Sequence, residues 1–598
     1  MQRYGLDIWG DDNFFIDNDL LKIDYKSSPS LLEITSKIRE NSSKGPLLLR
    51  FPHLVKKQID KLFCSFSRAS SELEYSGNFK AVFPLKVNQN PNLLKSLLDC
   101  SKDYEYGLEA GSKAELLIAI LNITNNKPIT VNGFKDKELI VLGFLSAKMG
   151  QDITLTIEGI NELETIIEYS QNHKITPKIG LRIRLHSLGS GQWAKSGGIN
   201  SKFGLTATEL ISAIQLLKKH NLLKQFTMIH FHIGSQITTI SPLKKALKEA
   251  GNIYADLKKM GADNLDTINL GGGLAVEYSQ NKENKIVNYS LDEYANDIVF
   301  TLQSISKNKN VKEPNIMVES GRYITASHAI LVTPIYEQFS QDYQENLLKL
   351  KEVNPPLVTE LTELYKSMTK STALEFLHDA LDHQNSLLTL FDLGYIDLVD
   401  RSNSEILTHL IIKKAIKLLD FINKSELNKI EEDIHEKYLV NFSLFQSTPD
   451  FWGLKQHFPV MPLAQLDKKP TRSATLWDIT CDSDGEIRFD KENPLYLHDI
   501  DLKNKDYFLG FFLIGAYQEV LGMKHNLFEK PTEVTVEIDN KGYKLKNLVN
   551  SPSIYDTLNS LGYDMEKLES NLGGNMNELD ELLQENSYLR TFINQENR

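Results

Sequence analysis

The sequence has little cysteine and no long apolar run. Its 598 residues include three cysteines, Cys64, Cys100 and Cys481, and no Cys-x-x-Cys pair. This small, odd number argues against a disulfide scaffold and a cysteine zinc site, and is typical of a reducing compartment. No stretch of 18 apolar residues occurs, so no membrane span is predicted. The first residues, MQRYGLDIWGDD, lack the basic and apolar regions of a signal peptide, so we expect a cytoplasmic protein.

Basic residues are also outnumbered. The chain has 67 lysines and arginines against 79 aspartates and glutamates, a net charge of −12. Non-specific binding to nucleic acid or anionic membranes needs a basic surface, so neither is an expected partner. The fractions of hydrophobic residues (41%) and charged residues (24%) are ordinary for a globular protein, and the length allows about two to four domains.

Eight short apolar runs between residues 80 and 322 predict a (β/α)8 barrel. Most are continuously apolar, as in strands that are buried on both faces, and helical segments separate them. One such helix is expected to have Ser241 as its N-cap, Pro242 at its first position and Gly261 after its last turn. A doubly wound sheet would give the same alternation, but the count favours the barrel. The runs are AVFPLKV, YGLEAGS, PITVNGF, DITLTIEG, KIGLRIRL, FTMIHFHIG, DTINLGGG and NIMVESGR.

The remaining chain predicts further units. Residues 1–50 read as an N-terminal segment that partly completes a second β unit, and residues 51–340 contain the barrel. Residues 341–452 show apolar residues at three- and four-residue steps, which predicts a helical insertion. Strand-like segments return in residues 453–550, a C-terminal β domain of sandwich or barrel type. Residues 551–598 predict an acidic helical tail.

Polar and glycine residues gather where the apolar runs end. Active sites of parallel barrels lie at the C-terminal ends of the strands, and a phosphate site often follows strands seven and eight. Lys86 and Glu109 end the first two runs. The residues at the ends of runs six, seven and eight include His232, Ser235, Gly271, Gly272, Gly273, Glu319, Gly321 and Arg322.

The three glycines and Arg322 indicate an anion site. Glycine backbone can approach an anion closely and turn its N–H groups toward it, while Arg322 and Ser235 add side-chain donors. The alternative is a tight turn beside a surface arginine. Lys86, in an apolar strand, would have a lowered pKa and become a nucleophile toward an aldehyde, unless it reaches solvent.

Two further side chains are candidates for contact with a planar cofactor. Glu319 would hold a proton on a heteroaromatic nitrogen, or form a salt bridge with Arg322. His230 and His232 alternate along one strand and point the same way, so one could lie flat against the cofactor ring; the alternative is a buried core histidine.

A second cluster, WDITCDSDG, places Cys481, Asp482 and Asp484 after a strand of the C-terminal β domain. The EF-hand pattern is not met. These acids suit the cationic end of a substrate, and the alternative is an acidic surface turn.

These motifs together resemble the biosynthetic arginine decarboxylases, pyridoxal-phosphate enzymes of the alanine-racemase-like fold. The matching segments are YGLDIWG, FPLKVNQ, LEAGSKAEL, GSGQWAKSGG, SKFGL, HFHIGSQ, NLGGGLAVEY, VESGRYI, TCDSDG and GAYQEVLGMKHNLF. The resemblance implies that L-arginine is converted to agmatine and CO2 on a route to putrescine and spermidine. It also implies a homodimer, or a dimer of dimers, in which TCDSDG enters the neighbouring subunit's active site. A Mg2+ requirement is implied without assignable ligands.

The resemblance also implies a role for each matching residue. Lys86 is similar to the Schiff-base lysine, Cys481 to the thiol that returns a proton to Cα, and Asp482 and Asp484 to acids that hold the guanidinium. Glu109 and Arg182 resemble further cofactor contacts, and Glu109 stands where the related ornithine decarboxylases have aspartate. The residues that resemble the remaining cofactor ligands are His232, Ser235, Gly271, Gly272, Gly273, Glu319, Gly321, Arg322 and Tyr517.

Three alternatives stay open at this stage. The chain could decarboxylate ornithine, lysine or meso-diaminopimelate instead of arginine. It could be an amino-acid racemase on the same barrel, although that chemistry favours an arginine where Glu319 stands. It could also be a non-catalytic pyridoxal-phosphate-binding protein, against which Lys86 and Cys481 argue.

Overall fold

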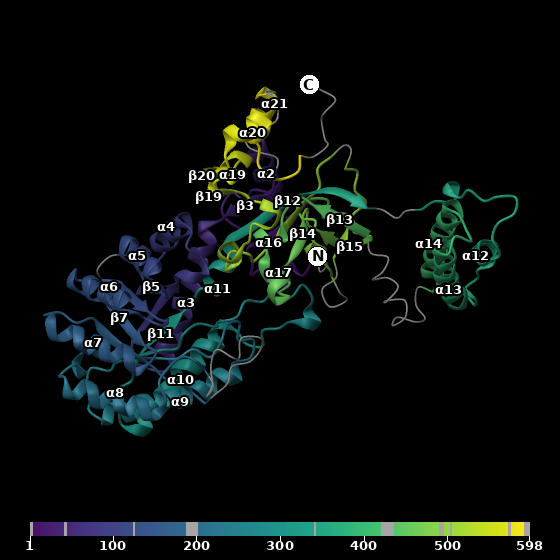
Figure 1. Cartoon of the computed structure of the whole chain (residues 1–598). Helices are drawn as coiled ribbons and strands as arrows, with labels where there is room; N and C mark the ends of the chain where they lie inside the picture. The colour runs from purple at the N-terminus through teal and green to yellow at the C-terminus, as the bar shows by residue number, and fades with distance from the viewer. Residues whose placement is uncertain are drawn as a thin grey trace.

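A computed structural model describes residues 4–40, 45–123, 126–186, 201–339, 343–419, 436–489, 495–502, 505–571 and 576–590. The predicted motif GSGQWAKSGG and part of the predicted helical insertion lie outside these residues. Figure 1 shows three bodies: a barrel ringed by helices, a β domain beside it, and a helical bundle set apart from both. Among the described residues, no helix is both apolar and long enough to cross a bilayer.

The eight predicted apolar runs form eight parallel strands that close into a barrel, which confirms the predicted fold class. The last strand pairs with the first, with Ile316 opposite Phe79, and this pairing closes the ring. Most strand residues are buried, because helices cover the outside and side chains fill the inside. The strands are β4 (Phe79–Pro84), β5 (Tyr106–Ala110), β6 (Pro128–Val131), β7 (Asp152–Ile157), β8 (Lys178–Arg182), β9 (Phe226–His230), β10 (Thr267–Asn269) and β11 (Asn315–Glu319).

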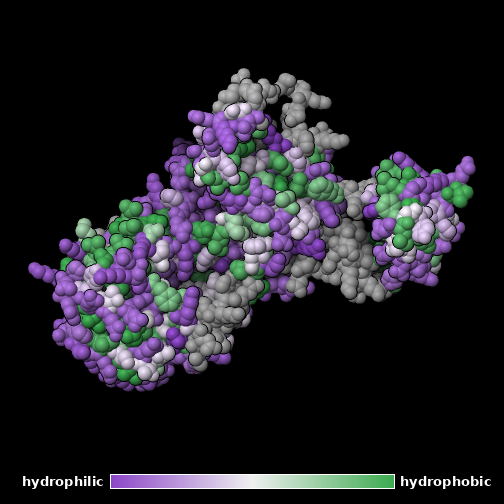
Figure 2. Space-filling view, viewed as in Figure 1, coloured by the Kyte–Doolittle hydropathy of each residue, from purple (hydrophilic) through white to green (hydrophobic). Residues whose placement is uncertain are grey.

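Helices connect consecutive strands of the barrel, and α3 (Pro52–Glu72) precedes β4. The connecting helices are α4 (Pro91–Cys100), α5 (Lys113–Asn122), α6 (Lys137–Lys148), α7 (Ile160–Asn172), α8 (Ala207–Lys219), α9 (Ile240–Lys259) and α10 (Leu291–Lys309). Figure 2 shows hydrophobic side chains gathered over α5 and α6, where Leu117, Leu121 and Leu145 are exposed.

The predicted start of α9 is wrong. Thr239 is the N-cap residue, two positions before Ser241, and its side chain makes no capping hydrogen bond. Pro242 therefore lies at the third helical position, where its missing N–H costs no intrahelical bond. Gly261 follows the helix with φ +91°, as expected of a residue that ends a helix in the left-handed region.

The β domain is built on a mixed sheet in which the strand order is β16-β15-β13-β12-β3-β19-β20. Its central strands are β3 (Leu47–Arg50) and β12 (Ala329–Phe339), so chain from both sides of the barrel meets in one sheet. The other strands on this path are β13 (Glu436–Val440), β15 (Arg472–Trp477), β16 (Glu486–Ile487), β19 (Thr532–Asp539) and β20 (Gly542–Val549). Three strands lie off this path: β14 (Val460–Pro462), β17 (Tyr496–Leu497), which pairs with β15, and β18 (Phe508–Phe511), which pairs with β12 and β14.

The N-terminal segment reaches the β domain in two ways. β3 lies between β12 and β19 in the sheet. The strand-like first 25 residues instead form a separate hairpin of β1 (Phe14–Asp17) and β2 (Leu20–Ile23), which is attached by backbone hydrogen bonds to Leu463 and Leu466.

The helical bundle contains α12 (Pro356–Ser367), α13 (Ala373–Asp392) and α14 (Leu398–Leu419) around a core of its own. Residues 436–440, in the range expected to be helical, form β13. Tyr438 and Val440 are buried while Lys437 and Leu439 are more exposed, and this two-residue period is that of a strand. After Pro552 the chain is helical, as predicted, in α19 (Ile554–Ser560), α20 (Met565–Asn571) and α21 (Met576–Leu583).

Candidate active site

A cavity lies at the C-terminal ends of β4, β9, β10 and β11. It is closed on one side by Tyr517, which comes from the β domain. The predicted site residues in its lining are Lys86, His232, Ser235, Gly272, Gly273, Glu319, Gly321, Arg322 and Tyr517. The structure thus brings together residues that are up to 431 positions apart in the chain.

Lys86 lies in the 3-10 turn η1 (Leu85–Val87) directly after β4, and its side chain is accessible inside the cavity. The negative charge of Glu109 raises the pKa of Lys86, against the opposing effect of burial, and Glu319 adds to the rise. The predicted fall in this pKa is therefore wrong for the protein alone, since two carboxylates outweigh desolvation. Burial raises the pKa of Glu109 to about 7, although Lys86 opposes this.

Glu319 ends β11 and its side chain is buried. Its Oε1 atom accepts hydrogen bonds from the side-chain amides of Asn132 (2.7 Å) and Asn269 (2.9 Å). His230 Nδ1 lies 3.7 Å from the same oxygen. These contacts, rather than a salt bridge to Arg322, hold the carboxylate at the cavity wall.

The two alternating histidines have different environments. His230 is buried behind the wall, while His232 lines the cavity. His232 Nδ1 accepts a hydrogen bond of 3.2 Å from the backbone N–H of Gly272, so the ring proton lies on Nε2. Burial, with a smaller contribution from the positive charge of Lys86, lowers the pKa of His232 to about 3. The imidazole is therefore neutral at pH 7.

The glycine turn after β10 passes so close to neighbouring backbone that it has no room for side chains. Gly271 has φ +70°, and a Cβ atom there would lie 2.5 Å from the carbonyl oxygen of Phe231. The N–H of Gly271 donates to Asn269 Oδ1 and the N–H of Gly272 donates to His232. Two of the three N–H groups expected to face an anion are thus engaged within the protein, and Gly271 does not line the cavity.

Arg322 and Tyr517 form the wall where the barrel meets the β domain. Arg322 is buried, donates to the hydroxyl of Tyr278 at 3.2 Å, and lies 4.7 Å from the centroid of the Tyr517 ring. Tyr517 has φ +69°, and its N–H donates to the carbonyl of Val87 at 2.8 Å. This hydrogen bond joins the segment after β18 directly to the turn that carries Lys86.

Arg182 lies outside the cavity lining. Its Nη1 atom donates to both carboxylate oxygens of Glu158, at 3.0 and 3.2 Å, and its guanidinium lies 4.6 Å from the Phe203 ring centroid. Glu158 also accepts the N–H of Gly133. In one chain, Arg182 therefore joins the ends of β7 and β8 to the loop after β6.

The acidic loop after β15 does not line this cavity within one chain. Cys481 is exposed, and its Sγ lies 3.3 Å from Asn526 Nδ2. Asp482 accepts the N–H of Asp484 and lies 3.4 Å from His525 Nε2. Asp484 accepts a hydrogen bond from Trp452 Nε1. Among the described residues, no group of three or more His, Cys, Asp or Glu side chains is placed to hold a metal ion, and the expected Mg2+ has no assigned ligands.

Sequence reasoning missed Asn132 and Asn269, which orient Glu319. Both lie at C-terminal strand ends, Asn132 in PITVNGF and Asn269 in DTINLGGG, where the barrel rule already places site residues. The position of each asparagine at a strand end was therefore enough to predict it as a site residue.

Two family models match the chain. The first, described as the pyridoxal-binding domain of pyridoxal-dependent decarboxylases, matches residues 59–326, and so covers the barrel and cavity. The second, the arginine decarboxylase helical bundle domain, matches residues 351–436. The fold and the first match define a pyridoxal-dependent decarboxylase class.

Comparison with curated proteins makes the family more specific. Biosynthetic arginine decarboxylases from Geobacter sp. (strain M21) and Phocaeicola vulgatus are each 38% identical to this chain, over 96% and 95% of its length and 93% and 92% of theirs. The chain belongs to the family of biosynthetic arginine decarboxylases, which confirms the resemblance seen in its motifs.

Solved structures agree with this assignment. The crystal structure of a biosynthetic arginine decarboxylase from Campylobacter jejuni is 55% identical, with a TM-score of 0.93 and 99% of each chain covered. A diaminopimelate decarboxylase from M. jannaschii has a TM-score of 0.63 at 18% identity, covering 93% of this chain and 99% of its own, and shows a shared fold only.

Proposed function

We propose that this chain binds pyridoxal phosphate at Lys86 and uses it to convert L-arginine to agmatine and CO2. The observation that carries this proposal is the arrangement in the cavity: an amine, a buried carboxylate and a glycine-rich wall with an arginine face one another. Membership of the family over the full chain length supports the same activity and the same substrate.

Several residues of the cavity lining fit a phosphate group. Ser235 offers a hydroxyl and Arg322 a guanidinium, and Gly273 adds a turn with φ +117° where a side chain would clash with Gly234 and Ile237. Charge-assisted donors of this kind bind phosphate strongly. Tyr517 would complete the phosphate site from the β domain.

Another lining residue, Glu319, fits a protonated pyridine ring. Glu319 has its Oε1 atom held by two amides, so its carboxylate stays in place to hold a proton on a ring nitrogen. Bound pyridoxal phosphate supplies an electron sink for the pair left at Cα when CO2 departs, and a protonated ring is the stronger sink. A racemase would favour the weaker sink, so the Glu319 carboxylate supports decarboxylation.

The remaining cavity residues orient reactants and move protons. His232 is neutral and fixed through Nδ1 by Gly272, so its flat ring can pack against a planar group without adding a second positive charge beside Lys86. The Lys86 amine would hold the cofactor carbonyl and, with Glu109 nearby, exchange protons during substrate entry and product release.

The thiol and acids of the TCDSDG loop require a second chain in this proposal. Cys481, Asp482 and Asp484 do not line the cavity of their own chain, yet the reaction needs a proton donor and a guanidinium contact there. We propose that a homodimer, or a dimer of dimers, brings this loop to the partner's cavity. Cys481 would then protonate Cα, and the two aspartates would accept hydrogen bonds from the substrate guanidinium.

A substrate panel tests the proposed activity. CO2 release is measured with L-arginine, L-ornithine, L-lysine and meso-diaminopimelate, and kcat/KM is compared. Paired carboxylates favour a guanidinium over an ammonium by about 10- to 150-fold, the equivalent of about 1.5–3 kcal/mol. Arginine should therefore lead by at least about 10-fold. A higher kcat/KM for another amino acid would refute the substrate assignment.

Mixing two impaired variants tests the shared site. Lys86→Ala and Cys481→Ala chains are denatured, combined and refolded together, with each variant refolded alone as the control. A mixed dimer has one cavity with both Lys86 and Cys481, so the activity of the mixture should exceed that of the two variants refolded alone. No recovery, with mixed dimers shown to be present by mass spectrometry, would exclude the contribution from the partner subunit.

A further inference from the structure

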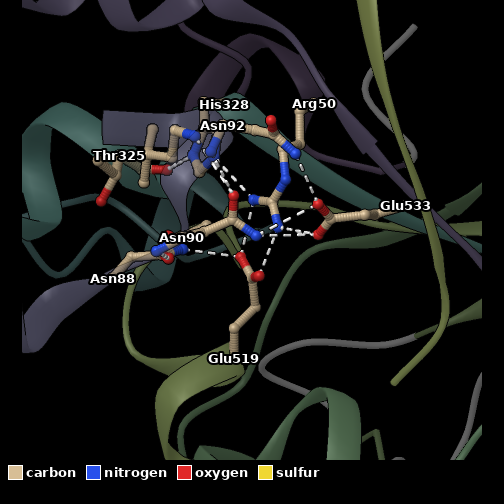
Figure 3. Close-up of polar contacts among 10 residues, drawn as sticks. Arg50, Asn88, Asn90, Asn92, Thr325, His328, Glu519 and Glu533 are labelled. Atoms are coloured by element: carbon tan, nitrogen blue, oxygen red, sulfur yellow. Dashed lines mark hydrogen bonds and ion pairs between the residues drawn. The ribbon is translucent and has the colours of Figure 1, made fainter. Parts of the chain in front are cut away.

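A buried ion-pair cluster lies between the β domain and the active-site end of the barrel (Figure 3). Its centre is Arg50 at the end of β3, with only 2% of its surface exposed. Arg50 forms two parallel hydrogen bonds with Glu519, at 2.9 and 2.5 Å, and its Nη2 also donates to Glu533 at 2.6 Å. One guanidinium thus joins two carboxylates that come from different parts of the β domain.

The Glu519 arm of this cluster leads to the turn that carries Lys86. Asn88, two residues after Lys86, donates through Nδ2 to Glu519 Oε1 at 2.7 Å and to the carbonyl of Gly515 at 3.2 Å. Glu519 is itself two residues after Tyr517, whose N–H donates to the carbonyl of Val87. The Lys86 turn and the Tyr517 segment are therefore tied together on both sides.

A second link leads from Arg50 to Arg322. His328 Nδ1 donates to the carbonyl of Thr325 at 2.5 Å, so its Nε2 accepts from Arg50 Nη1 at 3.2 Å. The Thr325 hydroxyl in turn donates to the carbonyl of Gly321. Gly321 is the N-cap of the short helix α11 (Arg322–Thr325), whose first residue is Arg322. Burial and the charge of Arg50 lower the pKa of His328 to about 4, in agreement with a neutral ring that accepts from Arg50.

Glu533, the second carboxylate on Arg50, contacts a different part of the barrel. Glu533 accepts hydrogen bonds from Asn90 and Asn92, at the start of α4 and beyond the Lys86 turn. Its side chain is 14% exposed and that of Glu519 is 15% exposed, and both contact the same guanidinium. The two carboxylates are therefore matched in burial and charge partner, and they differ in which part of the barrel they hold.

We infer that Arg50, Glu519 and Asn88 are positioning residues for the active site, which hold the Lys86 turn against the Tyr517 segment across the boundary between the barrel and the β domain. This inference rests on the proposed roles of Lys86 and Tyr517 as cofactor contacts. None of the three residues lines the cavity, so they act through their neighbours.

The physical basis is that the held conformation is not one that the segment adopts by itself. Tyr517 has φ +69°, a backbone conformation that is unfavourable for a residue with a Cβ atom. It persists because the surrounding contacts fix the backbone on either side. Without the Glu519 arm, Tyr517 and Asn88 lose their shared anchor, and the cofactor must order both segments when it binds.

The test compares Glu519→Gln with the matched control Glu533→Gln in the full chain. Each variant replaces one of the two carboxylates on Arg50, so both should lower the melting temperature of the cofactor-free protein, Glu519→Gln by more because Glu519 makes two of the three hydrogen bonds. Only Glu519→Gln should raise the Kd for pyridoxal phosphate, by about 10-fold or more, measured by titration of the visible absorbance. At saturating cofactor it should lower kcat while KM for arginine stays within about 2-fold.

A second pair serves if Glu519→Gln does not fold. Asn88→Ala removes the amide between the Lys86 turn and Glu519, and Asn92→Ala removes the corresponding amide on Glu533. Asn88→Ala alone should weaken cofactor binding. Equal effects of the two members of a pair on the Kd, or no effect of either, would overturn the inference. Failure of the wild-type chain to bind pyridoxal phosphate would instead refute the proposed function.

Discussion

Lowering the pH should remove much of the stability that Glu519 gives the fold. Burial alone would raise the pKa of this carboxyl, but the charge and hydrogen bonds of Arg50 outweigh burial and lower the pKa to about 2. The difference from the ordinary value of 4.5 corresponds to about 3 kcal/mol of unfolding free energy at neutral pH. Because the folded-state pKa is depressed, this contribution is present above about pH 4.5 and declines as the pH falls toward 2.

The contribution of Glu519 to the free energy of unfolding can be measured at intermediate pH. At pH 3 the linkage relation leaves less than half of the contribution, so about 2 kcal/mol is lost between pH 7 and pH 3. Urea unfolding of the wild type and of Glu519→Gln at pH 7, 5, 4 and 3 measures the difference in midpoint. That difference should be nearly constant from pH 7 to 5 and should then shrink.

The control replaces a carboxylate on the surface. Glu283→Gln changes an exposed side chain and should leave the free energy of unfolding within about 0.5 kcal/mol of the wild type at each pH. A difference between wild type and Glu519→Gln that stays constant down to pH 3 would refute the reasoning, because it would mean that the Glu519 ionisation contributes nothing to folding.

Two further variants test other parts of the site. Cys481→Ala should lower kcat with little change in KM and increase the fraction of turnovers that end in abortive transamination, measured as loss of the cofactor's visible absorbance during turnover; wild-type kcat and partition would exclude the thiol as the proton donor. Gly271→Ala places a Cβ atom 2.5 Å from the Phe231 carbonyl in a backbone with φ +70°, and should lower stability by about 1–3 kcal/mol and weaken cofactor binding. Gly453→Ala, where a Cβ atom would have no neighbour within 4 Å, is its control and should be neutral in thermal unfolding.

The barrel was predictable from local sequence because each of its strands is short, apolar and buried on both faces. β5 is one example, with all five of its residues buried. The placement of four site residues was predictable for a related reason. In a closed parallel barrel, all side chains that follow the C-terminal ends of the strands lie at the same end of the barrel. These residues are Lys86, His232, Glu319 and Arg322.

The parts that escaped prediction depend on distant partners. That β3, rather than the first 25 residues, enters the sheet is decided by its neighbours β12 and β19, hundreds of residues away. The pKa of Lys86 is raised rather than lowered because Glu109 and Glu319 lie near it. Local sequence patterns do not show that these two carboxylates come close to Lys86 in the fold. Arg50 and Glu519 are 469 positions apart, so their ion pair appears only in the folded chain.

Labelling of the cofactor lysine tests the central claim most directly. The purified wild-type chain is incubated with pyridoxal phosphate, reduced with borohydride and digested, and the modified peptide is identified by mass spectrometry. The account predicts that the phosphopyridoxyl group is attached to Lys86, and that Lys86→Ala loses both the label and CO2 release from arginine. Attachment to a different lysine, or unchanged CO2 release by Lys86→Ala, would contradict it.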